Sequence, residues 1–492
     1  MLLDRLRGAS DKSFAGRAGI IFFGTVVGQG LAFVLLPLTT RIYGAGSLGS
    51  AATVLAFLGI ASLFTCLQYD SAMIVARDGD VPYLLLLSSV MAVCWTAILG
   101  CVILIPLTAH WRHLLASLGL DWTLLPLILF YSHFTLLTNY RLRKNEVYKM
   151  SYGRIIYYGG SSVLQVAGGL ALGGHALVFL FAQTAGAFAS TLYLMPWRKL
   201  WSWSTGKRMD IKSVSREMMR VARIYVNFPR FQMPGGVLNA VSLHMPILFM
   251  RIVFSEAWAG WYFVAWRILA APTVLISQAI GQVFYRDSAE RERNGVSQGQ
   301  VLERIVFNLL RVSFLPALAL AVAAPFFVRI LLGEGWGPVG TILGILVVSM
   351  QVMFFTSPVS TFLNVKGMQA GFFGFCAAML LARAIALSVG WWLHSEIGSV
   401  TAYTIASVVV SIPFLWYIVR SAEGSVWRII RRSLRLFGDG AIAIAAIGCL
   451  WKMDILYKPQ GIIVVAGLLG VAGFREIRRI SLDRRGATTR GW

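Results

Sequence analysis

Residues 227–290 read NFPRFQMPGGVLNAVSLHMPILFMRIVFSEAWAGWYFVAWRILAAPTVLISQAIGQVFYRDSAE. Two long apolar runs in this stretch are joined by a short polar link, Arg251 to Glu256, and a charged segment closes it. A helix rises about 1.5 Å per residue, so roughly 20 apolar residues cross the roughly 30 Å of hydrocarbon in a bilayer. The stretch therefore predicts a transmembrane helical hairpin.

The order of proline, arginine, glycine and aspartate in this hairpin also occurs in the first half of the chain. Four residues of the first half recur 209 to 211 positions further along: Pro37, Arg41, Gly49 and Asp78 return as Pro246, Arg251, Gly260 and Asp287. We interpret the chain as two copies of one unit.

Apolar runs bounded by Gly, Pro and charge clusters predict fourteen membrane-spanning helices. Six lie in the first half, near residues 18–40, 47–76, 82–107, 122–142, 151–172 and 175–196. After a basic loop, Trp197 to Arg223, six more lie near 228–250, 257–284, 303–332, 338–364, 368–393 and 398–419. The last two lie near 437–456 and 459–477.

The predicted fold is an all-α polytopic membrane protein in three parts. Residues 1–205 and 206–420 form two six-helix bundles, and residues 421–492 form two additional helices with a basic tail. Because each bundle holds an even number of helices, both enter the membrane in the same sense. A parallel pseudo-repeat about an axis along the membrane normal then relates the two bundles.

Composition and charge support a membrane protein. Hydrophobic residues make up 57% of the 492 residues and charged residues 13%, which is far too apolar for an ordinary soluble domain. If both termini are cytoplasmic and the helices alternate, 35 of the 44 Lys and Arg residues fall on the cytoplasmic side, as the positive-inside rule requires. The net charge of +23 then reflects topology and attraction to anionic membrane lipids, and nucleic acid is not an expected partner.

Two further features bear on compartment. No signal peptide is expected, because the first sixteen residues contain five charged ones and no apolar run before a small-residue cleavage site. The five cysteines all lie in apolar runs, without the spacing of a disulfide framework or a zinc site.

Several segments resemble the Wzx-type oligosaccharide flippases of the multidrug/oligosaccharidyl-lipid/polysaccharide (MOP) superfamily. The seventh and eighth predicted helices carry the resemblance through Phe228 with Pro229, Pro246, AGWYFVAWR (259–267), Ala271 with Pro272, ISQAIGQVFYR (276–286) and SAE (288–290). RIYGAGSLGS (41–50) and QYDSAMIVARDGD (68–80) resemble the first and second helices of the same family. The matching segments follow the same order as in the family and cover most of the chain. They are patterns of helical residues and do not include a catalytic signature.

The resemblance implies a flippase of the bacterial inner membrane. Its substrate would be an oligosaccharide on undecaprenyl diphosphate, moved by alternating access from the cytoplasmic to the periplasmic leaflet for exopolysaccharide, O-antigen or capsule synthesis. A polysaccharide polymerase and a chain-length regulator are the protein partners that the resemblance implies. It implies no catalytic residue, no cofactor and no metal. Two alternatives stay open: an ion-coupled exporter of drugs and toxic compounds from the same superfamily, and a membrane glycosyltransferase or polymerase.

Three arginines inside predicted helices are candidates for binding an anionic substrate. Arg383 lies near the middle of the eleventh helix, Arg267 in the outer half of the eighth and Arg230 one turn inside the seventh. An arginine at helix-centre depth costs roughly 2.5 to 3.5 kcal/mol, so it normally faces a cavity or a partner, and a guanidinium binds phosphate with two hydrogen bonds. An internal salt bridge, or for Arg230 an interface anchor, is the alternative.

Asp70, His133 and His244 are candidates for ion coupling. Asp70 lies one or two turns inside the second helix, where a carboxylate serves either as a proton or cation site or as an interfacial group paired with a base such as Arg77. His133 in the fourth helix and His244 in the seventh could relay protons near neutral pH. The alternative for each histidine is an ordinary hydrogen-bonded side chain.

Two short motifs have simpler interpretations than their patterns suggest. Gly44, Gly46 and Gly49 have the G-x-G-x-x-G spacing of dinucleotide-binding folds, but they follow a predicted transmembrane helix and not a strand, which favours a tight turn. Asp78 and Asp80 form a D-x-D, a pattern that can hold a divalent metal with a sugar nucleotide. No nucleotide-binding domain surrounds it, so we interpret it as an ordinary loop.

Overall fold

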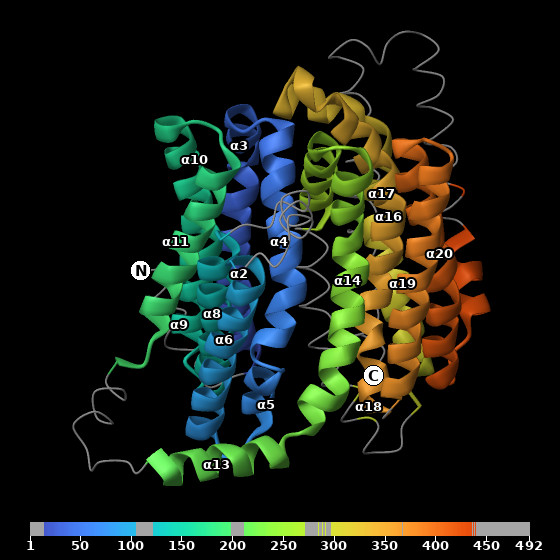
Figure 1. Cartoon of the computed structure of the whole chain (residues 1–492). Helices are drawn as coiled ribbons and strands as arrows, with labels where there is room; N and C mark the ends of the chain where they lie inside the picture. The colour runs from blue at the N-terminus through green and yellow to red at the C-terminus, as the bar shows by residue number, and fades with distance from the viewer. Residues whose placement is uncertain are drawn as a thin grey trace. The chain divides into compact units, whose positions relative to one another are not determined.

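The computed structural model describes residues 14–104, 122–197, 211–270, 297–366 and 368–434, together with residues 284, 288, 291, 436 and 438. These residues are almost entirely helical (Figure 1). The chain divides into two compact units, residues 1–264 and 265–492.

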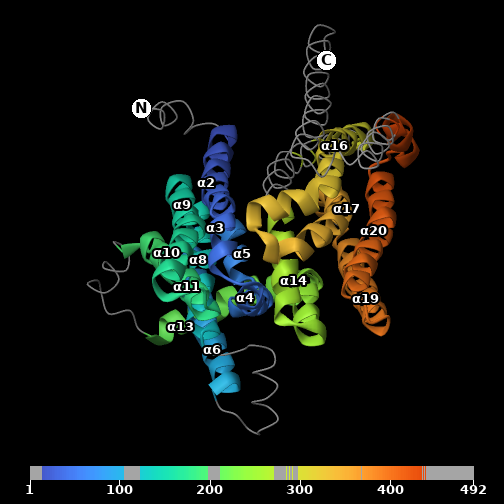
Figure 2. The ribbon, with the colours of Figure 1, turned by 90° about the horizontal axis from the view of Figure 1, so that it is seen from above.

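Each of the six spans predicted before residue 197 contains helix. In chain order the elements are α2 (Phe14–Val34), α3 (Leu36–Ile42), α4 (Ala45–Thr65), α5 (Tyr69–Val75), α6 (Val81–Leu104), α8 (Leu124–Arg143), α9 (Val147–Arg154), the π-helix η1 (Ile155–Gly160), α10 (Ser161–Leu172) and α11 (Ala176–Leu194). Leu67 and Gln68 both adopt left-handed backbone conformations, with φ of 48° and 62°, and separate α4 from α5. Seen end-on, α2, α8, α9, α10 and α11 lie together (Figure 2).

The first unit then continues through a surface helix into the hairpin that opens the second half of the sequence. Its remaining elements are α13 (Ile211–Ile224), the π-helix η2 (Phe228–Gln232), α14 (Met233–Phe249), the π-helix η3 (Met250–Phe254) and the start of a helix over residues 256–270. Beyond residue 270 most of the predicted eighth helix lies outside the described residues.

The prediction of a loop from Trp197 to Arg223 is wrong for its second part, because residues 211–224 form α13. This helix lies across the lower ends of the spanning helices in Figure 1 and packs against α6. Its apolar residues recur at helical spacing, and Val221 is fully buried in a core with Met73, Leu84 and Phe134. A charged 14-residue helix is too short and too polar to be found by a search for membrane spans.

The second unit contains the remaining predicted spans. They appear as α16 (Gly299–Leu332), the short η4 (Glu334–Trp336), α17 (Gly337–Ser360), α18 (Phe362–Val365), α19 (Gln369–Trp392) and α20 (Glu396–Ser421). Phe284, Leu302, Phe362, Phe414 and Ile418 lie in its core. The last two predicted spans lie almost entirely outside the described residues.

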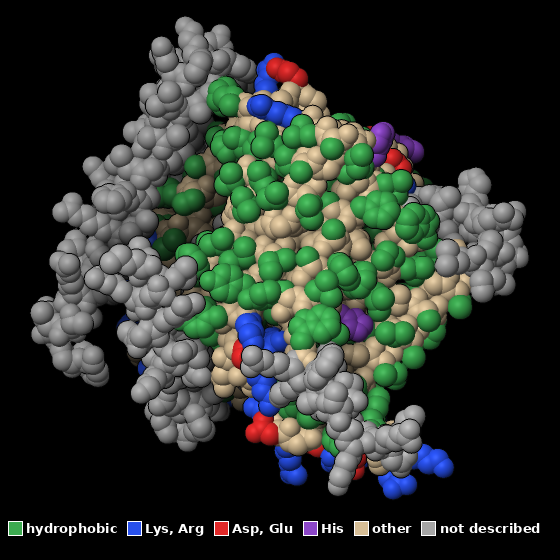
Figure 3. All heavy atoms as spheres, turned by 90° about the vertical axis from the view of Figure 1, so that its left-hand side faces the viewer, with side chains coloured by type: hydrophobic (Ala, Val, Ile, Leu, Met, Phe, Trp, Pro, Cys, Tyr) green, Lys and Arg blue, Asp and Glu red, His purple; other side chains and the backbone are tan. Residues whose placement is uncertain are grey.

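The described helices confirm a multi-pass membrane protein. Ten of them are long and apolar enough to cross a bilayer. Hydrophobic side chains cover much of the face in Figure 3, and Lys and Arg side chains gather toward its two ends. The predicted total of fourteen spans and the pseudo-repeat stay predictions.

Candidate functional site

Arg154 places a guanidinium inside a membrane-spanning segment of the first unit. It ends α9, within the span Val147–Leu172, and its Nη1 donates to Thr25 Oγ1 of α2 at 2.8 Å. Glycines on α2 allow this approach, because a Cβ on Gly24 would lie 2.5 Å from Ser151 Cβ and one on Gly28 would lie 3.1 Å from the Arg154 carbonyl oxygen. Small residues let membrane helices come close enough for polar side chains to meet.

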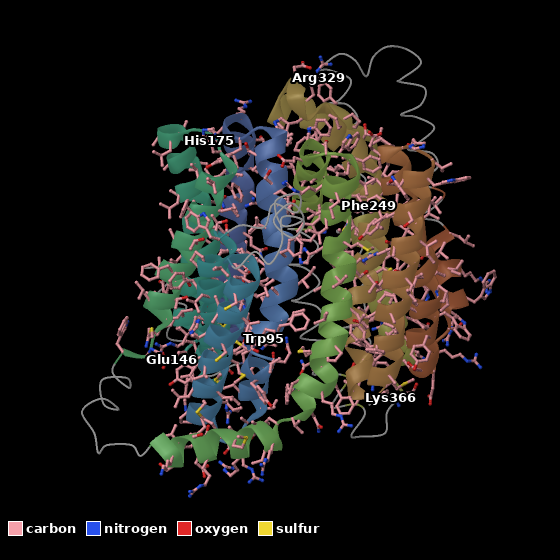
Figure 4. All side chains as sticks on the ribbon, in the orientation of Figure 1. Trp95, Glu146, His175, Phe249, Arg329 and Lys366 are labelled. Carbon is pink, nitrogen blue, oxygen red and sulfur yellow. The ribbon has the colours of Figure 1, made fainter. Side chains whose placement is uncertain are left out.

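Two other buried arginines of this unit contact carboxylates, whereas Arg154 contacts none within the described part of the chain. Arg141 contacts Glu146 at 2.7 Å, and Arg251 contacts Glu256 at 2.7 Å. Glu146 lies in the lower part of the unit in Figure 4, above α13. Among the described residues Arg154 has no carboxylate within ion-pair distance, and a guanidinium carries five N–H donors. The remaining donors can bind an anion.

Aromatic and amide side chains surround the turn that follows Arg154. The phenol of Tyr158 forms a hydrogen bond with Gln29 of α2, and the phenol of Tyr157 accepts one from Gln183 Nε2 at 2.8 Å. The Tyr157 ring stacks on Phe134, with centroids 4.5 Å apart. This turn is the π-helix η1, and π-turns inside α-helices occur frequently at functional sites. Phenol and amide groups can both donate to and accept from sugar hydroxyls.

Asp70 lies in the first turn of α5, directly after the break at Leu67 and Gln68. Its Oδ2 accepts a hydrogen bond from Asn139 Nδ2 of α8 at 3.0 Å. Within the described chain its hydrogen-bond partners are this neutral amide and the backbone N–H groups of the same turn, and not Arg77. A carboxylate held by an amide can gain or lose a proton without breaking an ion pair.

The two histidines occupy different surroundings. His133 makes a 2.8 Å hydrogen bond from Nδ1 to the Leu129 carbonyl oxygen of its own helix. This contact is the kind expected of an ordinary hydrogen-bonded histidine. His244 of α14 lies against Gly59 of α4, where any Cβ would collide with the imidazole. Gly59 therefore makes room for His244 at this helix contact, and a relay role for either histidine stays a prediction.

The three arginines predicted to bind substrate lie in different places. Arg383 of α19 is 8% exposed, donates from Nε to Ser407 Oγ of α20 at 2.9 Å and lies 4.7 Å from the Tyr403 ring centroid. These contacts, a hydrogen bond and a cation–π contact, join α19 to α20. Arg267 is half-buried in the helix of residues 256–270, and Arg230 is exposed beside the Phe231 ring. Their role in substrate binding stays a prediction.

The D-x-D motif joins neighbouring helices. Asp80 is 5% exposed, and its carboxylate accepts from Arg220 Nη2 at 2.6 Å and from the Tyr225 hydroxyl at 3.0 Å. Burial alone would raise the pKa of Asp80, but these hydrogen bonds outweigh it and lower the pKa below its ordinary value. Asp78 instead contacts Arg143 at 3.0 Å. The two carboxylates therefore hold separate arginines, and Asp80 fixes α13 to the first unit.

The sequence interpretation missed Arg154 because it started the fifth helix at residue 151. The helix begins at Val147, so Arg154 lies about two turns inside it and not at its edge. Glu146, which precedes the helix and pairs with both Arg141 and Lys149, is the sequence feature that could have marked the true start.

Comparison with protein families finds no match to this sequence, and comparison with curated proteins finds none. Solved structures do match. One is an inward-facing multidrug resistance MATE-family transporter of the MOP superfamily, with 16% identity, TM-score 0.58 and coverage of 80% of this chain and 95% of that chain. Another is the lipid II flippase MurJ in an inward closed conformation, with 13% identity, TM-score 0.57 and coverage of 94% and 99%.

A third structure is a MOP superfamily transporter from Pyrococcus furiosus, with 13% identity, TM-score 0.54 and coverage of 85% of this chain and 98% of that chain. At these identities the likeness shows the fold. The chain therefore has the fold that these transporters share with the flippase.

Proposed function

We propose that this protein is a flippase that moves an oligosaccharide linked to undecaprenyl diphosphate from the cytoplasmic to the periplasmic leaflet of the bacterial inner membrane. The observation that carries the proposal is the Arg154 guanidinium, which lies in a membrane-spanning segment without a carboxylate partner in the described chain. An anion is the ligand that such a group binds, and a diphosphate offers the paired oxygens that match it. The fold supports the proposal, since the lipid II flippase MurJ shares it over 94% of this chain.

The movement requires no covalent step, only a path on which the polar headgroup is not exposed to hydrocarbon. Arg154 would neutralise part of the diphosphate charge, and the phenol and amide groups of Tyr158 and Gln29 would replace water around the sugars, because burying unpaired polar groups is costly. The prenyl tail would stay in the bilayer. Arg383, Arg267 and Arg230 stay proposed as substrate-binding cations, each within its own unit, with a polymerase and a chain-length regulator as partners downstream.

A vesicle assay tests this function against the drug-exporter alternative. We expect the purified protein to speed the movement of a fluorescent prenyl-diphosphate saccharide between leaflets and to leave a cationic dye in place, because Arg154 attracts an anion and repels a cation. The fraction of label that an impermeant reductant can reach reports the movement. Transport of the dye without movement of the saccharide would favour the drug exporter.

A second expectation concerns coupling to a proton gradient at Asp70. If inward protons drive the cycle, the protonation of Asp70 must differ between its two access states, because only a differential interaction shifts such an equilibrium. Asp70→Asn mimics the protonated form and keeps a partner for Asn139. We expect this variant to bind the saccharide as the parent does but to lose any acceleration by an imposed pH gradient. A variant that responds to the gradient like the parent rules out Asp70 as the coupling site.

A further inference from the structure

A short helix over residues 426–434 follows α20, and its surroundings fix how it is rotated. Glu303 of α16, which is 1% exposed, accepts a hydrogen bond from the Ser425 backbone nitrogen at 2.7 Å and contacts Arg428 Nη2 at 3.1 Å. Ile429 and Ser433 are 5% and 1% exposed. One side of the helix is therefore packed on the second unit.

A second side of this helix is apolar and uncovered. Trp427, Ile430 and Leu434 are 70%, 40% and 59% exposed. Their spacing of three and four residues places them on one side of a helix with 3.6 residues per turn. Three large apolar side chains in a row are a poor surface to present to water.

The third side of the helix is basic. Arg428, Arg431 and Arg432 are all exposed. At 100° per residue they fill the arc between the Trp427 stripe and the packed face, with Arg431 next to Trp427 and Arg432 opposite the stripe. The sequence places this segment at the cytoplasmic ends of the predicted helices, where the leaflet is rich in anionic lipids. A helix with one apolar and one basic side lies in the plane of a membrane interface.

We propose that residues 426–434 form an interfacial helix that binds acidic phospholipids, with the Trp427, Ile430 and Leu434 stripe among the acyl chains and the arginines on the lipid phosphates. Guanidinium groups pair with phosphate oxygens, and a tryptophan with an apolar body and an N–H donor is suited to this depth. The helix anchors the second unit to one leaflet. This inference does not depend on what the protein transports.

The test uses the full chain in lipid discs, with a fluorophore on Ile430→Cys and with Cys94, Cys101 and Cys449 replaced by serine. We expect strong quenching by phosphatidylcholine that carries bromine on its acyl chains, and an emission change that saturates as phosphatidylglycerol is added. R431Q/R432Q should weaken the interaction by about fivefold per arginine, so that the emission change no longer reaches half of its parental size at the phosphatidylglycerol fraction that half-saturates the parent. The matched control, R216Q/R223Q, removes two exposed bases from α13 and should leave it unchanged.

Three outcomes overturn the proposal. Without quenching, the stripe is covered by the chain's own C-terminal segment or faces water, and the helix is not interfacial. Quenching that does not depend on phosphatidylglycerol shows apolar contact without recognition of acidic lipid. Equal shifts in the two double variants show that total charge, and not this helix, sets the response.

Discussion

We expect Arg154→Ala to abolish movement of the prenyl-diphosphate saccharide in vesicles, with the protein inserted at its normal level. Truncating one partner of a desolvated charge pair costs roughly 3 kcal/mol, which is about a hundredfold in binding. Arg154→Lys should retain part of the rate, because an ammonium keeps the charge but cannot match two phosphate oxygens at once. The measurement is the initial rate per inserted protein.

Two variants separate binding from structure at this position. Thr25→Ala keeps the charge and removes the hydrogen bond that orients it, so the rate should fall by about fivefold, the loss expected for roughly 1 kcal/mol. Arg216→Ala removes an exposed base of the same unit and should have no effect. If Arg154→Ala moves the saccharide at the parental rate, Arg154 does not bind it and the proposed function loses its main support.

The apolar runs predicted the spanning helices well because length and hydropathy depend only on the local sequence. Their interruptions were not predicted. The left-handed residues Leu67 and Gln68 and the π-helix η1 lie inside runs that read as continuous, because neither contains a proline and only the second contains glycine. Such breaks are set by packing against neighbouring helices, which the run itself does not record.

The contacts of the candidate residues also could not be predicted from the sequence. Asp80 and Arg220 are 140 positions apart and meet only because α13 folds back onto the first unit. Asp70 was expected either to pair with a base such as Arg77 or to form an ion site, and it contacts Asn139, 69 positions away. Spacing identifies charges at membrane depth, but whether a charge has a counter-ion is decided by tertiary contacts.

The G-x-G-x-x-G motif has a role that its pattern did not predict. Gly49 lies in α4 against the helix of residues 256–270: a Cβ on Gly49 would collide with the Glu256 carbonyl oxygen, and one on Gly260 would collide with the Ala45 carbonyl oxygen. Ala45 and Glu256 stand at the same separation in the sequence as Gly49 and Gly260. The two glycines therefore serve one close helix crossing, as small residues do in membrane proteins, and the predicted repeat stays a prediction.

We therefore expect Gly49→Ala to be among the most damaging small substitutions in this chain, costing about 3 kcal/mol of stability because the two backbones must separate. Gly46→Ala is the matched control from the same motif. Its Cβ would meet nothing nearer than Glu256 Oε2 at 3.9 Å, so it should gain about 0.5 to 1 kcal/mol from the better helix propensity of alanine.

Thermal unfolding of the detergent-solubilised protein measures both variants. Once Gly49→Ala has opened the crossing, Gly260→Ala should add little, because both glycines serve one contact and their effects are not additive. Arg251 should hold the separated helices near each other, since it bridges Ser50 Oγ at 3.0 Å and Glu256 at 2.7 Å. Equal melting temperatures for the Gly46 and Gly49 variants would show that the backbones do not meet at this crossing.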